Sequence, residues 1–237
     1  MRRAGHPFSR EQLDFTVRVM CPLVRERIYA HETQHWPERS LRRELVACIL
    51  GSQVRLESAI GTTKNLEHAG LLDDPWWESP EHADFESHVF DVLTARIPDL
   101  PYPKRYRFPQ ARSRQLALTR DALAQLSLVS RLASCDIAKD LRQTLVADIA
   151  GLGPKQASMF LRNTGISYDL AILDSHVLRF IEIQELAPDI KTQIGSVRGY
   201  EAAERALLGY AESIGYSAGY LDIAIWVTMR AAQELRR

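Results

Sequence analysis

Apolar residues recur at intervals of three and four along most of the chain, which is the spacing of one face of an α-helix. Two stretches show this spacing well: Leu41, Leu45, Cys48 and Ile49, and later Tyr200, Ala203, Leu207, Tyr210 and Ile214. Sustained alternation of apolar and polar residues, which is typical of half-buried strands, is hard to find. Glycine and proline fall mainly between the helical stretches. The pattern predicts an all-α protein of about ten helices.

Composition limits the classes of protein to which the chain can belong. Its 237 residues, 46% hydrophobic and 25% charged, are enough to bury a sizeable core. The formal net charge is zero, so any affinity for nucleic acid has to come from local patches. The 3 cysteines are widely spaced and form no CxxC pair, which indicates neither a disulfide framework nor a zinc or iron–sulfur site. We therefore expect no cofactor.

The setting of the protein follows from what the sequence lacks. No apolar run approaches the roughly 20 residues that cross a bilayer, and the first residues contain no signal-peptide core. We expect a soluble monomer in the cytoplasm, associated with the nucleoid if the source is prokaryotic.

Two neighbouring segments depart from the neutral average. Residues 72–91 contain seven acidic residues and no lysine or arginine, beside Trp76 and Trp77. Residues 102–120 contain six basic residues and no acidic residue, interleaved with aromatic side chains. The first segment would repel phosphate. The second predicts an edge that binds a nucleic-acid backbone, although a solvated helix face would explain the same residues.

Residues 145–165 predict a helix, a tight turn and a second helix. Gly151 and Gly153 flank the turn, Pro154 suits the first position of the second helix, and Gly165 ends that helix. Unpaired backbone N–H groups in the first turn of a helix bind phosphate well, and the two glycines allow another backbone to approach. We therefore predict Gly151 and Gly153 as DNA-binding positions, although such turns also join helices for packing alone.

Lys155 and Asp174 are the two residues in this region that suggest chemistry. Lys155 falls in the first turn of the second predicted helix, where the helix dipole disfavours its protonated form. A neutral lysine amine is a nucleophile, although a surface lysine is the alternative. Asp174 lies between an apolar run and the next helical pattern, so its ordinary role is that of an N-cap residue. Capping and chemistry are compatible.

These residues belong to the block GLGPKQASMFLRNTGISYDLAILDSHVLRFI. The block resembles the helix-hairpin-helix and Gly/Pro-Asp signature of base-excision DNA glycosylases, with Lys155 and Asp174 at the two catalytic positions. It is most similar to the archaeal-type second subfamily of 8-oxoguanine DNA glycosylases, which share the FLRN and AILD…H pieces. Three further blocks resemble the same subfamily: ELVACILGSQ, YRFPQAR and GYLDIAIWVTM.

The resemblance implies a two-lobed helical fold in which DNA and an extruded base lie in the cleft between the lobes. We expect a central domain of residues 46–165 that ends in the hairpin, and a second domain formed by residues 1–45 and 166–237. The implied activity is that of a bifunctional glycosylase and AP lyase, whose partner is DNA containing a damaged or modified guanine. In that family the lysine attacks C1′ and forms a Schiff base, while the aspartate stabilises positive charge on the sugar.

The resemblance also suggests residues that hold the base and the DNA. The predicted base pocket consists of Phe108 and Trp226, which would stack on a purine, and Asp222, which would accept hydrogen bonds from its edge. The predicted DNA contacts outside the turn are Gln53, Arg162, His176 and Arg179. Core packing for the aromatic residues and a plain helix surface for the polar residues are the alternatives.

The chain also departs from the archaeal-type pattern. Those enzymes end soon after the tryptophan helix with a terminal lysine, whereas this chain continues as MRAAQELRR and has the acidic insertion of residues 72–91. The absence of four clustered cysteines after Asp174 argues against the iron–sulfur branches of the superfamily. Two alternatives stay open: the same chemistry on another modified guanine, or a non-catalytic DNA-binding module in which Lys155 contacts phosphate.

Overall fold

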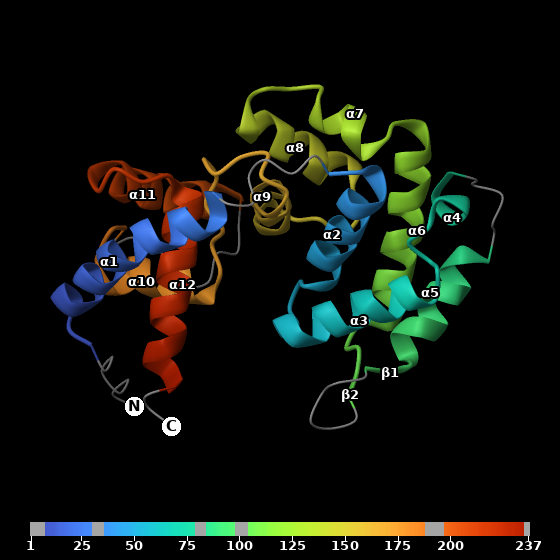
Figure 1. The fold of residues 1–237 in the computed structure, drawn as a ribbon, viewed down its shortest axis with the longest axis horizontal. Helices are drawn as coiled ribbons and strands as arrows, with labels where there is room; N and C mark the ends of the chain where they lie inside the picture. Colours follow the sequence, from blue (N-terminus) through green and yellow to red (C-terminus); the bar gives the residue numbers. More distant parts are fainter. Residues whose placement is uncertain (1–7, 30–35, 79–83, 98–103, 188–196, 235–237) are drawn as a thin grey trace. The chain divides into compact units, whose positions relative to one another are not determined.

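The computed structural model describes residues 8–29, 36–78, 84–97, 104–187 and 197–234, which form a mostly helical protein (Figure 1). The all-α class predicted from the apolar spacing is confirmed. The described ranges contain twelve helices instead of about ten, because two of them, Asp74–Glu78 (α4) and Leu128–Leu132 (α7), have only five residues each. A helix this short shows no sequence period. Residues 79–83 of the acidic insertion and the last three residues of the C-terminal extension lie outside the described residues.

The chain divides into two compact units, one of residues 35–166 and one of residues 1–34 with 167–237. The predicted first boundary lies between residues 45 and 46, whereas the structure divides the chain between residues 34 and 35. The predicted position falls inside α2, Glu38–Leu50. This helix packs on other helices of residues 35–166, so a domain boundary within it would divide a helix that belongs to one unit. At the other end the division lies after Ile166, one residue beyond the predicted position.

Residues 35–166 form the larger unit. Besides α2, α4 and α7 it contains α3 (Leu56–His68), α5 (Phe85–Thr94), α6 (Pro109–Gln125), α8 (Ala138–Asp148) and α9 (Pro154–Asn163). Two short antiparallel strands, β1 (Arg96–Ile97) and β2 (Lys104–Arg105), precede α6. Helix α2 lies inside this unit and packs on α3, α6, α7 and α9 (Figure 1).

Long-range hydrogen bonds fix the ends of helices in this unit. Both carboxylate oxygens of Glu38 accept hydrogen bonds from the first turn of α7, at the amides of Leu128 and Val129. The hydroxyl of Tyr106 donates to the carbonyl of Leu50 at 2.7 Å and thereby satisfies the C-terminal end of α2. The C-terminal end of α2 is therefore tied to the segment that leads into α6.

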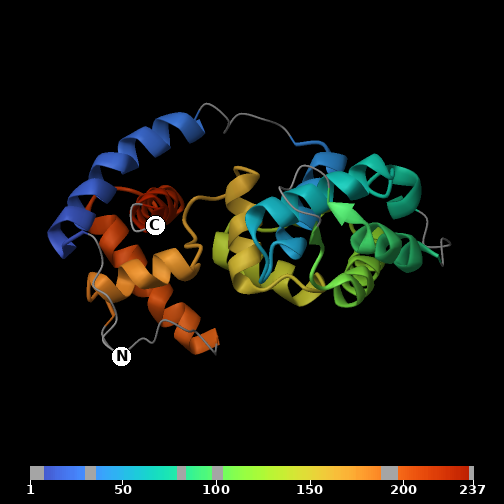
Figure 2. The ribbon, with the colours of Figure 1, turned by 90° about the horizontal axis from the view of Figure 1, so that it is seen from below.

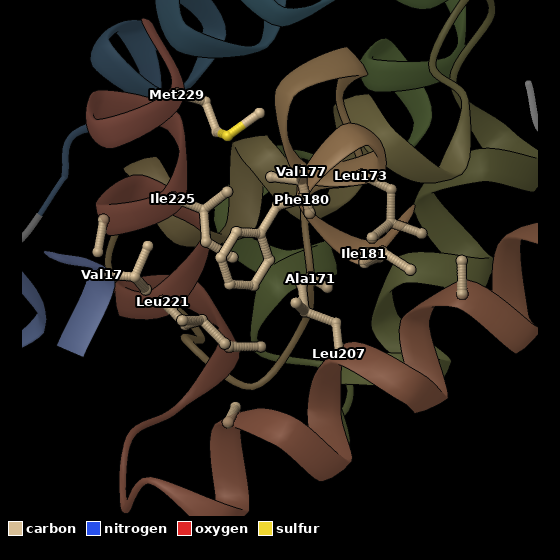
Figure 3. Close-up of a cluster of buried hydrophobic side chains, with 14 of the residues drawn as sticks. Val17, Ala171, Leu173, Val177, Phe180, Ile181, Leu207, Leu221, Ile225 and Met229 are labelled. Carbon is tan, nitrogen blue, oxygen red and sulfur yellow. The ribbon is translucent and has the colours of Figure 1, made fainter. Parts of the chain in front are cut away.

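The second unit consists of α1 (Arg10–Tyr29), α10 (Ser175–Ile183), α11 (Val197–Ser213) and α12 (Ala218–Glu234). Helix α12 packs on each of the other three, and Figure 2 shows it nearly end-on beside α1. Figure 3 shows the core, with the ring of Phe180 from α10 pointing toward Ile225 and Leu221 of α12. These apolar contacts hold the segment that leads into α10.

Candidate active site

Helices α8 and α9 form the helix-turn-helix that the sequence predicts. The guanidinium of Arg142 on α8 donates to the hydroxyl of Ser158 on α9 at 3.2 Å, and the hydroxyl of Thr119 on α6 donates to the carbonyl of Ala150 in the turn. Gly151 has a φ of 80°, which glycine adopts without strain. Gly153 is the N-cap residue of α9 with an ordinary φ of −86°. Only the first glycine is therefore required by the backbone conformation.

Replacing Gly151 with alanine should lower the free energy of unfolding by about 1–2 kcal/mol, because the residue would have a positive φ. Its new Cβ would also lie 2.5 Å from Oε1 of Gln115, so that side chain would have to move. Gly209→Ala in helix α11 is the matched control, since nothing lies within 4 Å of the Cβ that it would add. It should raise the free energy of unfolding by about 0.5–1 kcal/mol. Urea denaturation measures both, and a Gly151→Ala protein as stable as the wild type would contradict the conformation of the turn.

Lys155 lies in the first turn of α9 and is partly exposed. No side chain caps this helix, so its first amides are not used by a local acceptor. Within the described ranges the ammonium group of Lys155 takes part in no hydrogen bond or ion pair. The amine is therefore not committed to a structural contact.

The charge of Lys155 acts on α2. Burial is the largest of the causes that raise the pKa of the Cys48 thiol well above its ordinary value, and Glu44 raises it further. The positive charges of Arg162 and Lys155 oppose this shift. Lys155 and Arg162 are seven residues apart, which places them on one face of α9, and α9 packs on α2. Glu44 also accepts a 2.7 Å hydrogen bond from the Asn163 side chain, which joins the two helices.

Asp174 is the N-cap residue of α10, as its local sequence predicts. Its Oδ1 accepts hydrogen bonds from the backbone N–H groups of His176 and Val177, both at 2.9 Å. The other oxygen, Oδ2, has no hydrogen-bond partner among the described residues. The side chain is partly exposed. One oxygen thus holds the carboxyl group in place, and the second is available to a substrate.

The predicted pocket residues Asp222 and Trp226 lie on one face of α12, one turn apart. The guanidinium of Arg230, one turn further, lies over the Trp226 ring at 5.0 Å from its centroid. The ring of His176 meets Trp226 edge to face at 6.4 Å. Trp226 is partly exposed, whereas Asp222 is 2% exposed.

The polar atoms of His176 and Asp222 are partly or wholly buried. The ring of His176 is partly exposed, and its Nδ1 is buried with no partner among the described residues, so the predicted phosphate contact would use Nε2. The carboxylate of Asp222 accepts a hydrogen bond from the amide of Ile172 at 3.0 Å. This bond and the burial of Asp222 give its carboxylate a structural role, and the contact with a base stays a prediction.

The other predicted residues lie near the surface. Gln53 is exposed, follows the end of α2 and has a φ of 63°, a conformation that costs a non-glycine residue about 1 kcal/mol or more. Such strain is found at functional positions. Phe108 is the N-cap residue of α6, and the guanidinium of Arg107 lies over its ring. Arg162 bonds to Asn163, and Arg179 pairs with Glu182.

A family model described as 8-oxoguanine DNA glycosylase matches residues 24–216 of the chain. The chain belongs to this family.

Curated relatives of this 8-oxoguanine DNA glycosylase family member are named 8-oxoguanine DNA glycosylase/AP lyase. The protein of Metallosphaera sedula is 31% identical over 192 residues, which cover 80% of this chain and 81% of the relative. The protein of Thermotoga maritima is 30% identical over 211 residues, 88% and 90% of the two chains.

Solved structures of the glycosylase family have the same fold. The 8-oxoguanine DNA glycosylase of Thermotoga maritima matches with a TM-score of 0.67 at 27% identity, over 92% of this chain and 93% of that one. The Methanocaldococcus jannaschii 8-oxoguanine glycosylase/lyase, solved with a 15mer DNA that contains 8-oxoguanine, matches with a TM-score of 0.63 at 23% identity. That alignment covers 91% of this chain and 88% of the other.

In this glycosylase family member, part of the charge in the acidic and basic segments is taken up by contacts within the protein. Asp73 and Asp74 of the acidic insertion pair with Arg39 and Arg42 of α2, so part of its negative charge is neutralised within the unit. In the basic segment, Arg112 and Arg120 are buried and bond to nearby residues. The exposed charges described there are Arg105, Arg107 and Arg114.

No cluster of three or more histidine, cysteine, aspartate or glutamate side chains that could hold a metal ion occurs in the part of the chain that the structure describes. Among the same residues, no helix is both long and apolar enough to cross a membrane.

Proposed function

We propose that this family member is a bifunctional DNA glycosylase and AP lyase that removes 8-oxoguanine from DNA. Its relatives from Metallosphaera sedula and Thermotoga carry that name at 30–31% identity over most of their length. The observation that carries the proposal is Lys155, an uncommitted amine in the first turn of an uncapped hairpin helix. A binding module needs only a charge at this position, whereas a lyase needs an amine that can form an imine.

The first chemical step breaks the bond between the base and the sugar. The neutral Lys155 amine attacks C1′ of the damaged nucleoside, the bond from C1′ to the base nitrogen breaks, and the base leaves with a proton. Positive charge develops on the sugar during this step. Asp174 supplies a carboxylate whose Oδ1 is held by two amides and whose Oδ2 can stabilise that charge.

The second step cleaves the strand. The sugar ring opens, so that C1′ and Nζ of Lys155 form an imine and the ring oxygen takes up a proton. Loss of a proton from C2′ then expels the 3′ phosphate by β-elimination. Water hydrolyses the imine and frees the lysine. This sequence needs no redox partner, since each bond that breaks is replaced by one that forms.

The DNA contacts are proposed from the surface residues. The first amides of α9, beside Gly151 and Gly153, can bind a phosphate because no side chain caps them. Gln53, exposed and strained after α2, can fill the space left in the duplex by the extruded base. Arg162 and Arg179 would add positive charge beside the backbone.

The base contacts are proposed from the aromatic residues. Trp226 and Phe108 are partly exposed and each has a guanidinium over its ring, from Arg230 and Arg107 respectively. Stacking on a purine would use the opposite face of either ring. We further propose that the protein acts as a monomer in the cytoplasm.

Release of free base from a panel of duplexes tests this function. The panel contains 8-oxoguanine opposite each of the four bases, another oxidised guanine, and an undamaged guanine as the control. We expect single-turnover release of 8-oxoguanine, accompanied by strand nicking, and none from undamaged guanine. Release of another modified guanine alone would move the specificity to that base. DNA binding without release from any duplex would leave a non-catalytic module and contradict the proposal.

A further inference from the structure

Residues 168–174, here called the aspartate loop, lead into α10 and end at Asp174. Four residues of this loop are buried although none is in a helix or strand: Leu170, Ala171, Ile172 and Leu173. Buried backbone amides need hydrogen-bond partners, and this segment has no ladder to supply them. The partners come from α11 and α12.

The beginning and middle of the aspartate loop are held by two helices. The amide of Gly219 at the start of α12 donates to the carbonyl of Tyr168 at 2.8 Å. On α11, the Glu204 carboxylate accepts from the amide of Ala171 at 3.3 Å, and the Tyr200 hydroxyl donates to the carbonyl of Ala171 at 2.9 Å. The path of the loop is thus set before it reaches the catalytic carboxylate.

Asp222 holds the last part of the loop. Its Oδ2 accepts the amide of Ile172 at 3.0 Å, and the carbonyl of the same Ile172 accepts the amide of Asp174 at 3.0 Å. A bond between residues two apart makes a tight turn around Leu173. Ile172 therefore links the buried Asp222 carboxylate to the backbone of Asp174 through these two hydrogen bonds.

We propose that Asp222 is a positioning residue that sets the place of the Asp174 carboxylate through the backbone of Ile172. The inference rests on the proposed function, because it concerns the residue that stabilises charge on the sugar. A carboxylate buried to 2% exposure is costly unless it is hydrogen-bonded, and a hydrogen bond from an amide to an ionised carboxylate is stronger than one between neutral groups. Asp222 thus acts through Asp174.

A double-mutant cycle measures this dependence. Asp222→Leu keeps a similar volume and removes the acceptor of the Ile172 amide. We expect it to slow single-turnover release of 8-oxoguanine by roughly ten-fold or more in the wild-type background. In the Asp174→Asn background, the same change should slow release by less than about three-fold, because the group that it positions is already lost.

Two controls separate positioning from loss of the fold. Leu207→Ala removes a fully buried side chain from α11 in the same core, and is assayed well below the melting temperature of each variant. It should lower the melting temperature and leave the release rate within about two-fold of the wild type. Affinity for a duplex with a non-cleavable abasic analogue should be unchanged by Asp222→Leu.

The outcomes are distinguishable. Equal losses in the two backgrounds would show that Asp222 acts independently of Asp174 and would overturn the inference. A loss confined to 8-oxoguanine in a panel of substrates would indicate reading of the base and would also overturn it, as would an unchanged rate. In each of these cases the wild type still releases 8-oxoguanine. A wild-type protein that releases no base contradicts the proposed function itself, and the inference with it.

Discussion

Replacing Lys155 with alanine should abolish strand nicking and borohydride trapping on a duplex that contains 8-oxoguanine. Base release should fall by on the order of a thousand-fold or more, because the amine that attacks C1′ is gone. The side chain takes part in no hydrogen bond or ion pair with described residues, so the fold should be preserved. Denaturing gels of trapped complexes and of nicked strand measure both losses, and circular dichroism checks the helices.

Lys139→Ala is the matched control, since Lys139 is exposed on α8, the other helix of the hairpin. Its removal takes the same charge from the same structural element, and trapping should persist. If instead both variants lose DNA affinity alike and trapping is unaffected at saturating protein, then Lys155 acts only as a positive charge.

Replacing Asp174 with asparagine should slow base release by roughly a hundred- to a thousand-fold while stability stays nearly constant. Asparagine caps a helix about as well as aspartate, so the amides of His176 and Val177 keep their acceptor. What is lost is the negative charge on Oδ2. Single-turnover release and urea denaturation are measured on the same preparation.

Asp174→Ala separates the two functions of this carboxylate. Alanine removes the cap as well as the charge, so it should reduce the free energy of unfolding by about 1 kcal/mol beyond the asparagine variant. The release rates of the two variants should be similar. An asparagine variant with wild-type turnover would reduce Asp174 to a helix cap.

Local sequence signals predicted the parts of the site that depend on neighbouring residues. Pro154 begins α9, and Asp174 caps α10, because the first-turn geometry of a helix is set within a few positions. The same reasoning gave the tight turn at Gly151, whose φ is 80°. It gave too much weight to glycine at position 153, because the φ of −86° at that residue is also adopted by other residue types.

Contacts between distant residues could not be predicted in this way. Asp222 meets Ile172 across 50 positions of sequence, so its burial and its partner follow only from the packing of α12. The same limit affected the charged segments. Arg39 pairs with Asp73 over 34 positions, and Arg120 is buried over the ring of Phe85. A count of charges cannot distinguish a surface patch from a set of internal pairs.

The most direct test of the account is the identity of the residue that forms the imine. The sequence contains five lysines: Lys64, Lys104, Lys139, Lys155 and Lys191. Wild-type protein is incubated with an 8-oxoguanine duplex, reduced with borohydride, digested and mapped by mass spectrometry. The account predicts that the sugar remnant is found on the peptide that carries Lys155. A remnant on another lysine, on the N-terminal amine, or on no peptide would contradict it.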